Sequence, residues 1–288
     1  MLEYLIYKAI QFLALTLPWR TLSWLAITIA DWNFRLNHIS RTAMISNLRV
    51  ILGESATDDE VERVAKETFR NFGKYMVEFF RFARVGNRFL KKSVTTRGEE
   101  YLDEARSHGR GVVAVSAHLS NWELAGAKFA SLGCSVSGIA LEHKNRRIKR
   151  LFDRQRARMR VRTYSLTRGG RRCLEALQRN GVICLVADRD LTGTGIFVDY
   201  FGKPAKFPVG PARFSLASGA PLVPTFMVRQ PDDTFELIFE APIYPPHEGD
   251  KKELVRKLTS DCARACERYV KRYPEQFANF FPIWEEQP

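Results

Sequence analysis

The chain has 288 residues and 45% hydrophobic content, which is enough to bury a full core, so ordered structure is expected throughout. Its 45 Lys and Arg against 32 Asp and Glu give a formal net charge of +13. That excess indicates anionic partners such as nucleic acid, an acidic membrane surface or phosphorylated substrates. The five cysteines form no CxxC pair and no metal-like spacing with histidine, which argues against a disulfide framework or a metal site and fits a reducing, cytosol-facing compartment.

The first expected elements are two apolar helices. Residues 4–34 are almost wholly apolar and aromatic, but basic residues interrupt them and Pro18 breaks them, so no uncharged run reaches the roughly 20 residues of a simple membrane span. Two short helices lying in a membrane interface fit best, because tryptophan favours that zone, and the alternative is a pair of buried core helices. The tryptophans are Trp19, Trp24 and Trp32. We therefore expect a membrane-associating segment at 1–36 and a second unit at 37–288.

The remainder of the chain predicts an α/β fold. Apolar and aromatic residues recur at helical spacing over 58–84, and Thr57 or Asp58 can cap that helix. After Gly98, helices alternate with apolar, β-branched runs, which predicts a mixed, mostly parallel central sheet flanked by helices. Strands are expected at 112–117, 135–141, 182–188, 219–230 and 234–243. Helices are expected at 101–109, 123–133, 145–160, 171–181 and 251–274.

His118 directly follows the strand at 112–117, where open α/β sheets usually place their ligands. On one continuous helix His118 and Glu123 would point about 140° apart, so they converge only if His118 lies on the loop before the helix, as expected. A carboxylate beside an imidazole fixes its tautomer and lets the other nitrogen take a proton from a hydroxyl. The alternative is a helix start alone, in which Ser120 and Glu123 form a capping box and His118 is incidental.

The stretch HLSNWE, with four residues between His118 and Glu123, resembles the signature of the late acyltransferases of lipid A biosynthesis. The same signature marks their relatives that acylate phosphatidylinositol mannosides, within the wider glycerolipid acyltransferase group. The resemblance continues through three further segments and covers most of the chain from about residue 35 onward. These segments are EHKNRRIKRLFDRQRARMRV at 142–161, the stretch at 185–224 that begins LVADRD, and the closing YPEQF at 273–277.

This resemblance implies a glycerolipid acyltransferase-like fold and transfer of a fatty acyl group from an acyl thioester to a hydroxyl of a membrane glycolipid. The donor would be carried by acyl carrier protein or coenzyme A, with no further cofactor. The acceptor would be a lipid A precursor or, alternatively, a phosphatidylinositol mannoside. His118 would be the general base, with Glu123 holding and polarising it. The expected location is the cytosolic face of the inner membrane.

Arginines dominate the segment from Lys144 to Arg172, which holds thirteen Lys and Arg and a single acid, Asp153. A solvated helix face is the usual explanation of a charge run, but such runs normally mix signs. Planar guanidinium groups bind phosphate bidentately, so the candidate ligands are acceptor phosphates, the donor phosphopantetheine or anionic membrane headgroups. By similarity to the family's arginine-containing block, Arg158 is the first candidate for substrate binding and Arg156 the second.

Asp188, Arg189 and Asp190 end the expected strand at 182–188 and so lie on the same edge of the sheet as His118. An ordinary strand-ending turn is the structural alternative. The resemblance implies that Asp188 orients an arginine or an acceptor hydroxyl, and its two neighbours are further substrate-binding candidates. Arg189 departs from many lipid A members, which carry glutamine there, and is closer to the mannoside acyltransferases.

A nucleic-acid-binding protein is the alternative from a different class, because the arginine-rich segment and the pI of 9.7 also suit a phosphate backbone. The chain shows no recognised nucleic-acid motif, and an apolar, tryptophan-bearing N-terminus has no use in that interpretation. We therefore expect the partners to be the thioester donor, the glycolipid acceptor and an anionic membrane, without nucleic acid.

Overall fold

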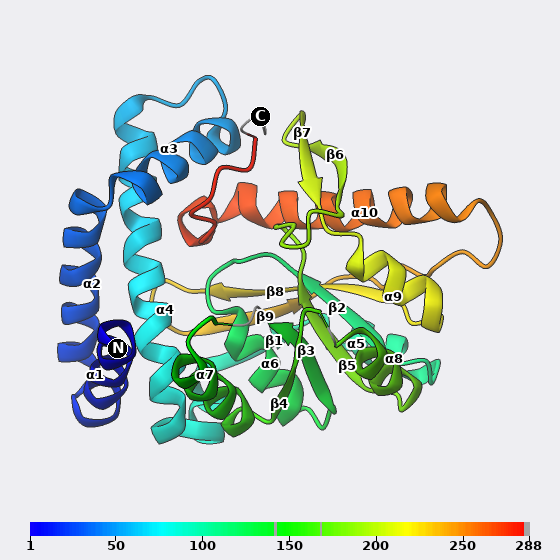
Figure 1. Ribbon diagram of the computed structural model, residues 1–288, viewed down its shortest axis with the longest axis horizontal. Helices are drawn as coiled ribbons and strands as arrows, with labels where there is room; N and C mark the ends of the chain where they lie inside the picture. The colour runs from blue at the N-terminus through cyan, green and yellow to red at the C-terminus, as the bar shows by residue number, and fades with distance from the viewer. Residues whose placement is uncertain (141–142, 168, 285–288) are drawn as a thin grey trace.

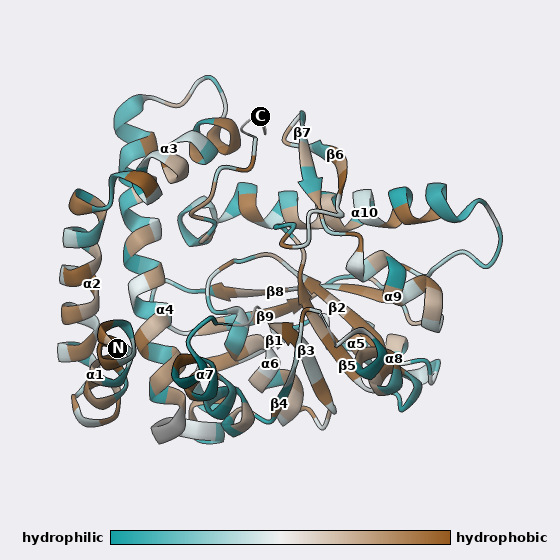
Figure 2. Ribbon diagram, in the orientation of Figure 1, coloured by the Kyte–Doolittle hydropathy of each residue, from teal (hydrophilic) through white to brown (hydrophobic). Residues whose placement is uncertain are grey.

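The computed structural model describes residues 1–140, 143–167 and 169–284. For residues 83–85 it describes the backbone but not the side chains. A seven-stranded sheet lies at the centre of the molecule, and the first helices stand together beside one end of it (Figure 1). The sheet order is β1-β9-β8-β2-β5-β3-β4, and every neighbouring pair is parallel except β8 with β9. The prediction of a mixed, mostly parallel sheet is confirmed. Figure 2 shows the strands of this sheet as mainly hydrophobic.

The strands agree with the expected runs where these are long and apolar. The central strands are β2 (Val112–Ser116), β3 (Val136–Ala140), β5 (Val182–Val186), β8 (Leu222–Arg229) and β9 (Phe235–Phe239). Four short strands were not expected: β1 (Val94–Arg97), β4 (Val161–Ser165), and the separate antiparallel hairpin of β6 (Ile196–Tyr200) and β7 (Lys203–Phe207). Each has only four or five residues and a mixed polar pattern, so periodicity does not reveal it.

Helices cover both faces of the sheet. Alternate side chains of β2 point to opposite faces, so they pack into two different hydrophobic clusters. Val112 and Ala114 belong to one buried cluster, shared with α5 (Glu99–Ser107), α6 (Trp122–Ser131) and α7 (Arg146–Arg158). Val113 and Val115 belong to another, shared with α8 (Gly170–Gln178), α9 (Gly210–Ser218) and α10 (Lys251–Arg272). A continuous apolar strand is thus buried on both faces.

The N-terminal part forms α1 (Leu2–Thr16), α2 (Trp19–Leu36), α3 (His38–Leu52) and α4 (Asp58–Ser93). Pro18 separates α1 from α2, as the sequence predicts. The Thr57 hydroxyl accepts a hydrogen bond from the Glu60 amide and caps α4, also as predicted. The helix continues to Ser93, beyond the expected end, across a kink at Gly86, whose φ of 50° suits glycine.

Helices α1 and α2 present two different faces. Ala14, Leu22 and Ala26 are buried in the cluster that includes α4, and a Cβ at Gly73 of α4 would lie 2.9 Å from the Ala26 carbonyl oxygen, so the helices pack closely. The outer faces of α1 to α3 leave large apolar side chains exposed: Leu2, Leu5, Ile6, Phe12, Trp24, Ile29, Trp32, Leu36 and Ile39. None of the described helices is both long and apolar enough to cross a membrane. Contact with a membrane and the division at residue 36 stay predictions.

Candidate active site

The register of β2 and β5 brings His118 to Asp188. Ser116 and Val186, the last residues of these parallel neighbours, are partners in the sheet, and the Ala187 amide donates to the Ser116 carbonyl at 2.8 Å. His118 and Asp188 each lie two residues beyond their strand. The expectation that both residues occupy the same carboxyl edge of the sheet is confirmed.

The Asp188 carboxylate holds the His118 imidazole in one orientation. Asp188 Oδ1 accepts from the His118 backbone N–H at 3.1 Å and lies 2.9 Å from His118 Nδ1. An ionised carboxylate only accepts, so Nδ1 carries a proton, and in the neutral imidazole the lone pair is then on Nε2. Among the residues that the structure describes, none hydrogen-bonds Nε2. The Asp188 side chain is fully buried, whereas 26% of the His118 side chain is exposed, so the imidazole is open to a substrate on one side.

The C-terminal segment clamps the loop that carries His118. The Ala278 amide donates to the His118 carbonyl at 2.7 Å, and the Ser120 amide donates to the Gln276 carbonyl at 2.8 Å. The buried Asn279 amide lies 3.4 Å from Asp188 Oδ2. This support follows α10 and the short 3₁₀ turn Pro274–Gln276. YPEQF, just before Asn279, belongs to the resemblance seen in the sequence, but Asn279 carries no sequence signal of its own.

The helix after His118 begins one residue later than a capping box would require. Asn121, not Ser120, is the N-cap of α6, and its side chain accepts from the Leu124 amide at 3.2 Å. Ser120 has a φ of 51°, a left-handed conformation outside the helix, and its hydroxyl is buried without a hydrogen-bond partner in the described chain. The proposed Ser120 cap is therefore wrong.

Glu123 contacts an arginine of α7 instead of His118. Glu123 Oε1 accepts from Arg156 Nη2 at 2.7 Å and from Nε at 3.0 Å, and Oε2 lies 3.2 Å from the same Nε. Burial acts to lower the pKa of Arg156, but the charge and hydrogen bonds of Glu123 outweigh it, so that pKa is raised. The structure therefore corrects the partner assigned to His118, because the first turn of α6 presents Glu123 to α7.

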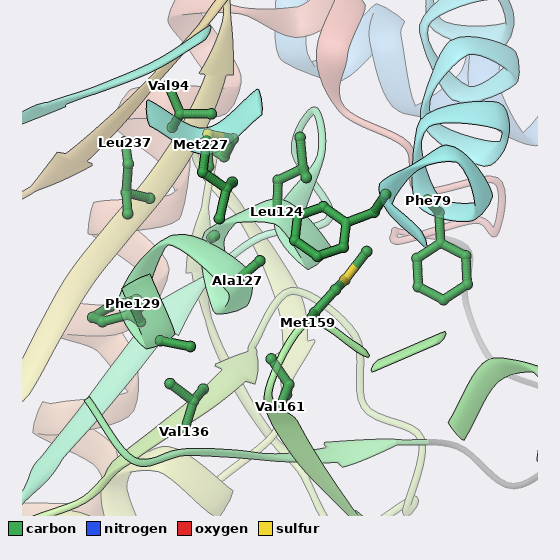
Figure 3. Packing of buried hydrophobic residues seen from close by; sticks show 14 of the residues in the cluster. Phe79, Val94, Leu124, Ala127, Phe129, Val136, Met159, Val161, Met227 and Leu237 are labelled. Atoms are coloured by element: carbon green, nitrogen blue, oxygen red, sulfur yellow. The ribbon is translucent and has the colours of Figure 1, made fainter. Parts of the chain in front are cut away.

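Packing around α6 fixes this arrangement. Figure 3 shows Leu124 and Ala127 of α6 in the same buried cluster as Phe79 of α4 and Met159 at the end of α7. Trp122, beside Glu123, lies edge-on to His118 with ring centroids 4.9 Å apart and stacks on Tyr75 of α4 at 4.4 Å. The imidazole and the carboxylate are thus held by separate neighbours on one short segment.

The other expected substrate-binding residues are spread around this edge. Arg158 is exposed and lines a cavity between α1 and α7, so it is not brought to His118. The Arg189 guanidinium lies 3.3 Å above the centre of the Phe281 ring, and burial lowers its pKa. Asp190 accepts from the Gly195 amide at 2.7 Å and the Thr192 hydroxyl at 2.8 Å, which makes it the organiser of its own loop. Residue 142 of the basic segment, and Arg168, lie outside the described residues.

The cysteines offer no activated nucleophile. Burial raises the pKa of the Cys173 thiol to about 11 and the pKa of Cys184 and of Cys262 to about 12. Such thiols stay protonated at neutral pH and react poorly. Across the described residues, no group of three His, Cys, Asp or Glu side chains is placed to hold a metal ion. At this edge of the sheet His118 presents a partly exposed imidazole whose Nδ1 is held by Asp188.

Comparison with known proteins shows which family this chain belongs to. The model of the bacterial lipid A biosynthesis acyltransferase family matches residues 1–286. The chain belongs to this family. The resemblance seen in the sequence is confirmed, including its mannoside branch, because the curated relatives are phosphatidylinositol mannoside acyltransferases.

Two of these relatives come from mycobacteria. A phosphatidylinositol mannoside acyltransferase of Mycobacterium tuberculosis (strain ATCC 25618 / H37Rv) is 33% identical over 164 residues, which are 55% of this chain and 52% of the relative. One of Mycolicibacterium smegmatis is 26% identical over 242 residues, which are 83% of this chain and 77% of the relative. The chain thus spans about half the length of the first of these relatives.

Proposed function

We propose that this protein transfers a fatty acyl group from an acyl thioester to a hydroxyl of a membrane glycolipid. The observation that carries the proposal is the imidazole of His118, whose Nδ1 is held by the buried Asp188 carboxylate while Nε2 stays free. Membership of the lipid A acyltransferase family supports the reaction class. The edge of the sheet at which this pair lies is where α/β proteins bind their substrates.

The chemistry follows from the free nitrogen. His118 Nε2 takes the proton of the acceptor hydroxyl as that oxygen attacks the carbonyl carbon of the thioester. Asp188 stabilises the imidazolium that forms and keeps its tautomer. The tetrahedral intermediate then collapses, the carbon–sulfur bond breaks, and the leaving thiolate takes the proton back from Nε2. The products are the acylated glycolipid and the free thiol, and the enzyme returns to its starting state.

Arg156 supplies a fixed positive charge beside this reaction. Glu123 holds two of its nitrogens, which removes the freedom of a long side chain. A guanidinium so fixed can meet a phosphate of either substrate with its remaining N–H donors, two on Nη1 and one on Nη2. In this proposal Asp188 takes the place beside His118 that was expected for Glu123, and Glu123 acts on substrate through Arg156.

Two acceptors define the range of the proposal. The family model is described for lipid A biosynthesis, whereas the relatives are described as phosphatidylinositol mannoside acyltransferases. Both acceptors are anionic glycolipids with sugar hydroxyls, which suits a chain with a formal net charge of +13. The donor is an acyl thioester of acyl carrier protein or coenzyme A, and no other cofactor is part of the proposal.

The proposed location is the cytosolic face of the inner membrane. The exposed apolar side chains of α1 to α3 support it, because Trp24 and Trp32 are 62% and 61% exposed. Trp19 differs, since it packs against the core. A helix pair with one face in the core and the other carrying tryptophans suits the headgroup zone of a bilayer.

The first experiment follows the acyl chain. Full-length protein is incubated with radiolabelled acyl thioesters of acyl carrier protein and of coenzyme A, and with vesicles that contain a lipid A precursor or a phosphatidylinositol mannoside. We expect label in one acceptor with the wild type and with the matched control His247→Ala, whose imidazole is exposed. His118→Ala should be slower by about 10²–10⁴-fold. Equal rates for His118→Ala and wild type would show that His118 is not the base, and no labelled acceptor with either donor would refute the proposed activity.

A further inference from the structure

A cationic cavity lies between α1 and α7, away from His118. Its volume is about 340 Å³, and five of its lining residues are basic: Lys8, Arg147, Arg150, Arg154 and Arg158. Among the described residues that line it, none is a carboxylate. Figure 2 shows α7 as one of the most hydrophilic helices of the molecule. We name this cavity, defined by those five residues, the α1–α7 groove.

Residues of both helices form the groove, and the regular spacing of its arginines brings them together. Its four arginines recur at intervals of three and four along α7 and so share one face of the helix. The core side of α7 fixes α1 in place, since the rings of Tyr7 and Phe152 meet edge to face with centroids 5.2 Å apart. Arg156 lies about half a turn from the groove arginines, so the groove and the Glu123 contact use opposite faces of α7.

Within the described part of the chain, the five basic side chains of the groove have no ion pair with a carboxylate. No described residue makes an ion pair or hydrogen bond with Arg150, Arg154 or Arg158. Lys8 donates to the neutral Gln11 amide oxygen at 2.8 Å, and the Arg147 guanidinium lies 3.3 Å from the sulfur of Met1 and near the ring of Tyr4. Nearby on the same helix, in contrast, Lys149 pairs with Asp153 at 2.7 Å.

Uncompensated cations on facing helices repel one another, and an anion in the cavity removes that cost. Several guanidinium groups within one cavity match a phosphate group, because each offers a planar pair of donors. The source of the phosphate follows from position. The outer side of α1 exposes Leu2, Leu5 and Phe12, which places the groove beside the apolar surface of the N-terminal helices.

We infer that the α1–α7 groove binds the headgroup phosphate of an anionic membrane phospholipid. This lipid is neither the acceptor nor the donor of the acyl group, and it fixes α1 against α7 at the membrane surface. The inference rests on the proposed membrane association, but it does not require acyl transfer.

The test measures binding of full-length protein to vesicles of phosphatidylcholine with and without phosphatidylglycerol. The groove variant Arg150→Gln/Arg154→Gln is compared with Arg179→Gln/Arg256→Gln, which removes the same charge from exposed positions on or near α8 and α10. We expect affinity for the anionic vesicles to fall about tenfold or more in the groove variant and about twofold or less in the control. Affinity for phosphatidylcholine alone should change little in either.

Three outcomes overturn the inference. If wild type and groove variant bind anionic vesicles equally, the groove is not the site, although membrane association stands. If the wild type binds no vesicle, the groove inference and the proposed membrane association fail together. The rate of acyl transfer tests the proposed reaction separately. If the groove variant instead loses affinity for coenzyme A, measured by calorimetry without vesicles, and keeps its affinity for anionic vesicles, the phosphate belongs to a soluble ligand.

A second variant separates binding from folding. Arg150→Lys/Arg154→Lys keeps both charges, so it should retain more of the anionic-vesicle affinity than the glutamine variant does. Equal losses in the lysine and glutamine variants, with unchanged melting temperatures, would contradict an electrostatic site.

Discussion

The imidazole of His118 owes its orientation to a residue 70 positions away in the chain. Asp188 bonds both the ring and the backbone amide of His118, so one carboxylate oxygen sets the position of the loop and of the side chain together. Asn279 lies 3.4 Å from the other oxygen. The pair is therefore supported from both sides, as a base needs if its free nitrogen is to meet a hydroxyl in one geometry.

Asp188→Asn tests this arrangement at the level of one atom. The amide keeps the shape but can donate to Nδ1, which moves the proton to Nε2 and removes the lone pair. We expect the acyl transfer rate to fall by roughly 10³-fold or more while the melting temperature changes little. The matched control is Asp199→Asn, an exposed carboxylate on β6. A rate within a few-fold of wild type would show that Asp188 does not set the tautomer.

At the scale of elements, a buried ion pair connects the helix after His118 to the sheet. Glu78 of α4 lies 2.8 Å from Arg229 at the end of β8, and both side chains are 6% exposed. The same carboxylate accepts from the Asn121 side chain at 2.9 Å, and Asn121 caps α6. One carboxylate thus joins α4, β8 and α6.

Glu78→Gln should therefore destabilise the protein, because it leaves the buried Arg229 guanidinium with the partly exposed Asp233 carboxylate, 3.1 Å away, in place of two charged partners. The expected loss in the free energy of unfolding is at most about 3–5 kcal/mol, the cost of a buried charge left without any partner. Glu62→Gln is the matched control, since its pair with Arg41 is solvent-exposed and its loss should stay below about 1 kcal/mol. Denaturant unfolding of both variants measures the difference, and similar losses would mean that the buried network adds nothing specific.

The contact between α2 and α4 gives a pH dependence of known sign. Arg70 donates to both carboxylate oxygens of Asp31 at 2.7 and 2.8 Å, and these hydrogen bonds hold the pKa of Asp31 below its usual value. The stabilisation is present above the pKa of the unfolded carboxyl, about 3.9, and is lost as the pH falls through the lower pKa of the folded state.

Unfolding of the wild type and Asp31→Asn across acidic pH checks this. The wild type should be more stable at neutral pH, and its advantage should shrink as the pH falls below about 4. Asp199→Asn, with an exposed carboxylate, should show no comparable convergence. An advantage that is constant with pH would mean that the ionised form of Asp31 makes no special contribution.

The whole molecule combines an apolar surface, a cationic groove and the sheet edge that carries His118. Exposed apolar residues gather on α1 to α3, the groove lies between α1 and α7, and α7 carries Arg156 on its other face. If the apolar surface enters the headgroup zone, its contact with lipid should depend little on lipid charge and salt, whereas the contact of the cationic groove should depend on both.

Trp24→Ser/Trp32→Ser isolates the apolar part. We expect binding to phosphatidylcholine vesicles to weaken by roughly tenfold or more, because each indole buries a large apolar area, and the loss should persist at high salt. The groove variant, in contrast, should differ from wild type mainly at low salt and on anionic vesicles. Phe197→Ser, at a 61% exposed position on β6, is the matched control. Unchanged binding by the tryptophan variant would place the membrane contact elsewhere.

Several features of this protein depend on local pattern and could be predicted from the sequence. Long β-branched runs predicted the central strands, Pro18 predicted the break between the first helices, and the position of His118 after β2 predicted the sheet edge on which it lies. HLSNWE together with the three further segments that carry the resemblance correctly pointed to the family. These predictions hold because each depends on residues that are close together in the sequence.

The contacts between side chains at the site could not be predicted from the sequence, because they join residues that are far apart in the chain. The contact of His118 with Asp188 depends on the register of β2 and β5, and that of Glu123 with Arg156 depends on the packing of α6 against α7. The support from Asn279 comes from the far end of the chain. Periodicity reports which face of an element is buried, but it does not report which distant side chain that face meets, because strand register and helix packing are properties of the assembled core.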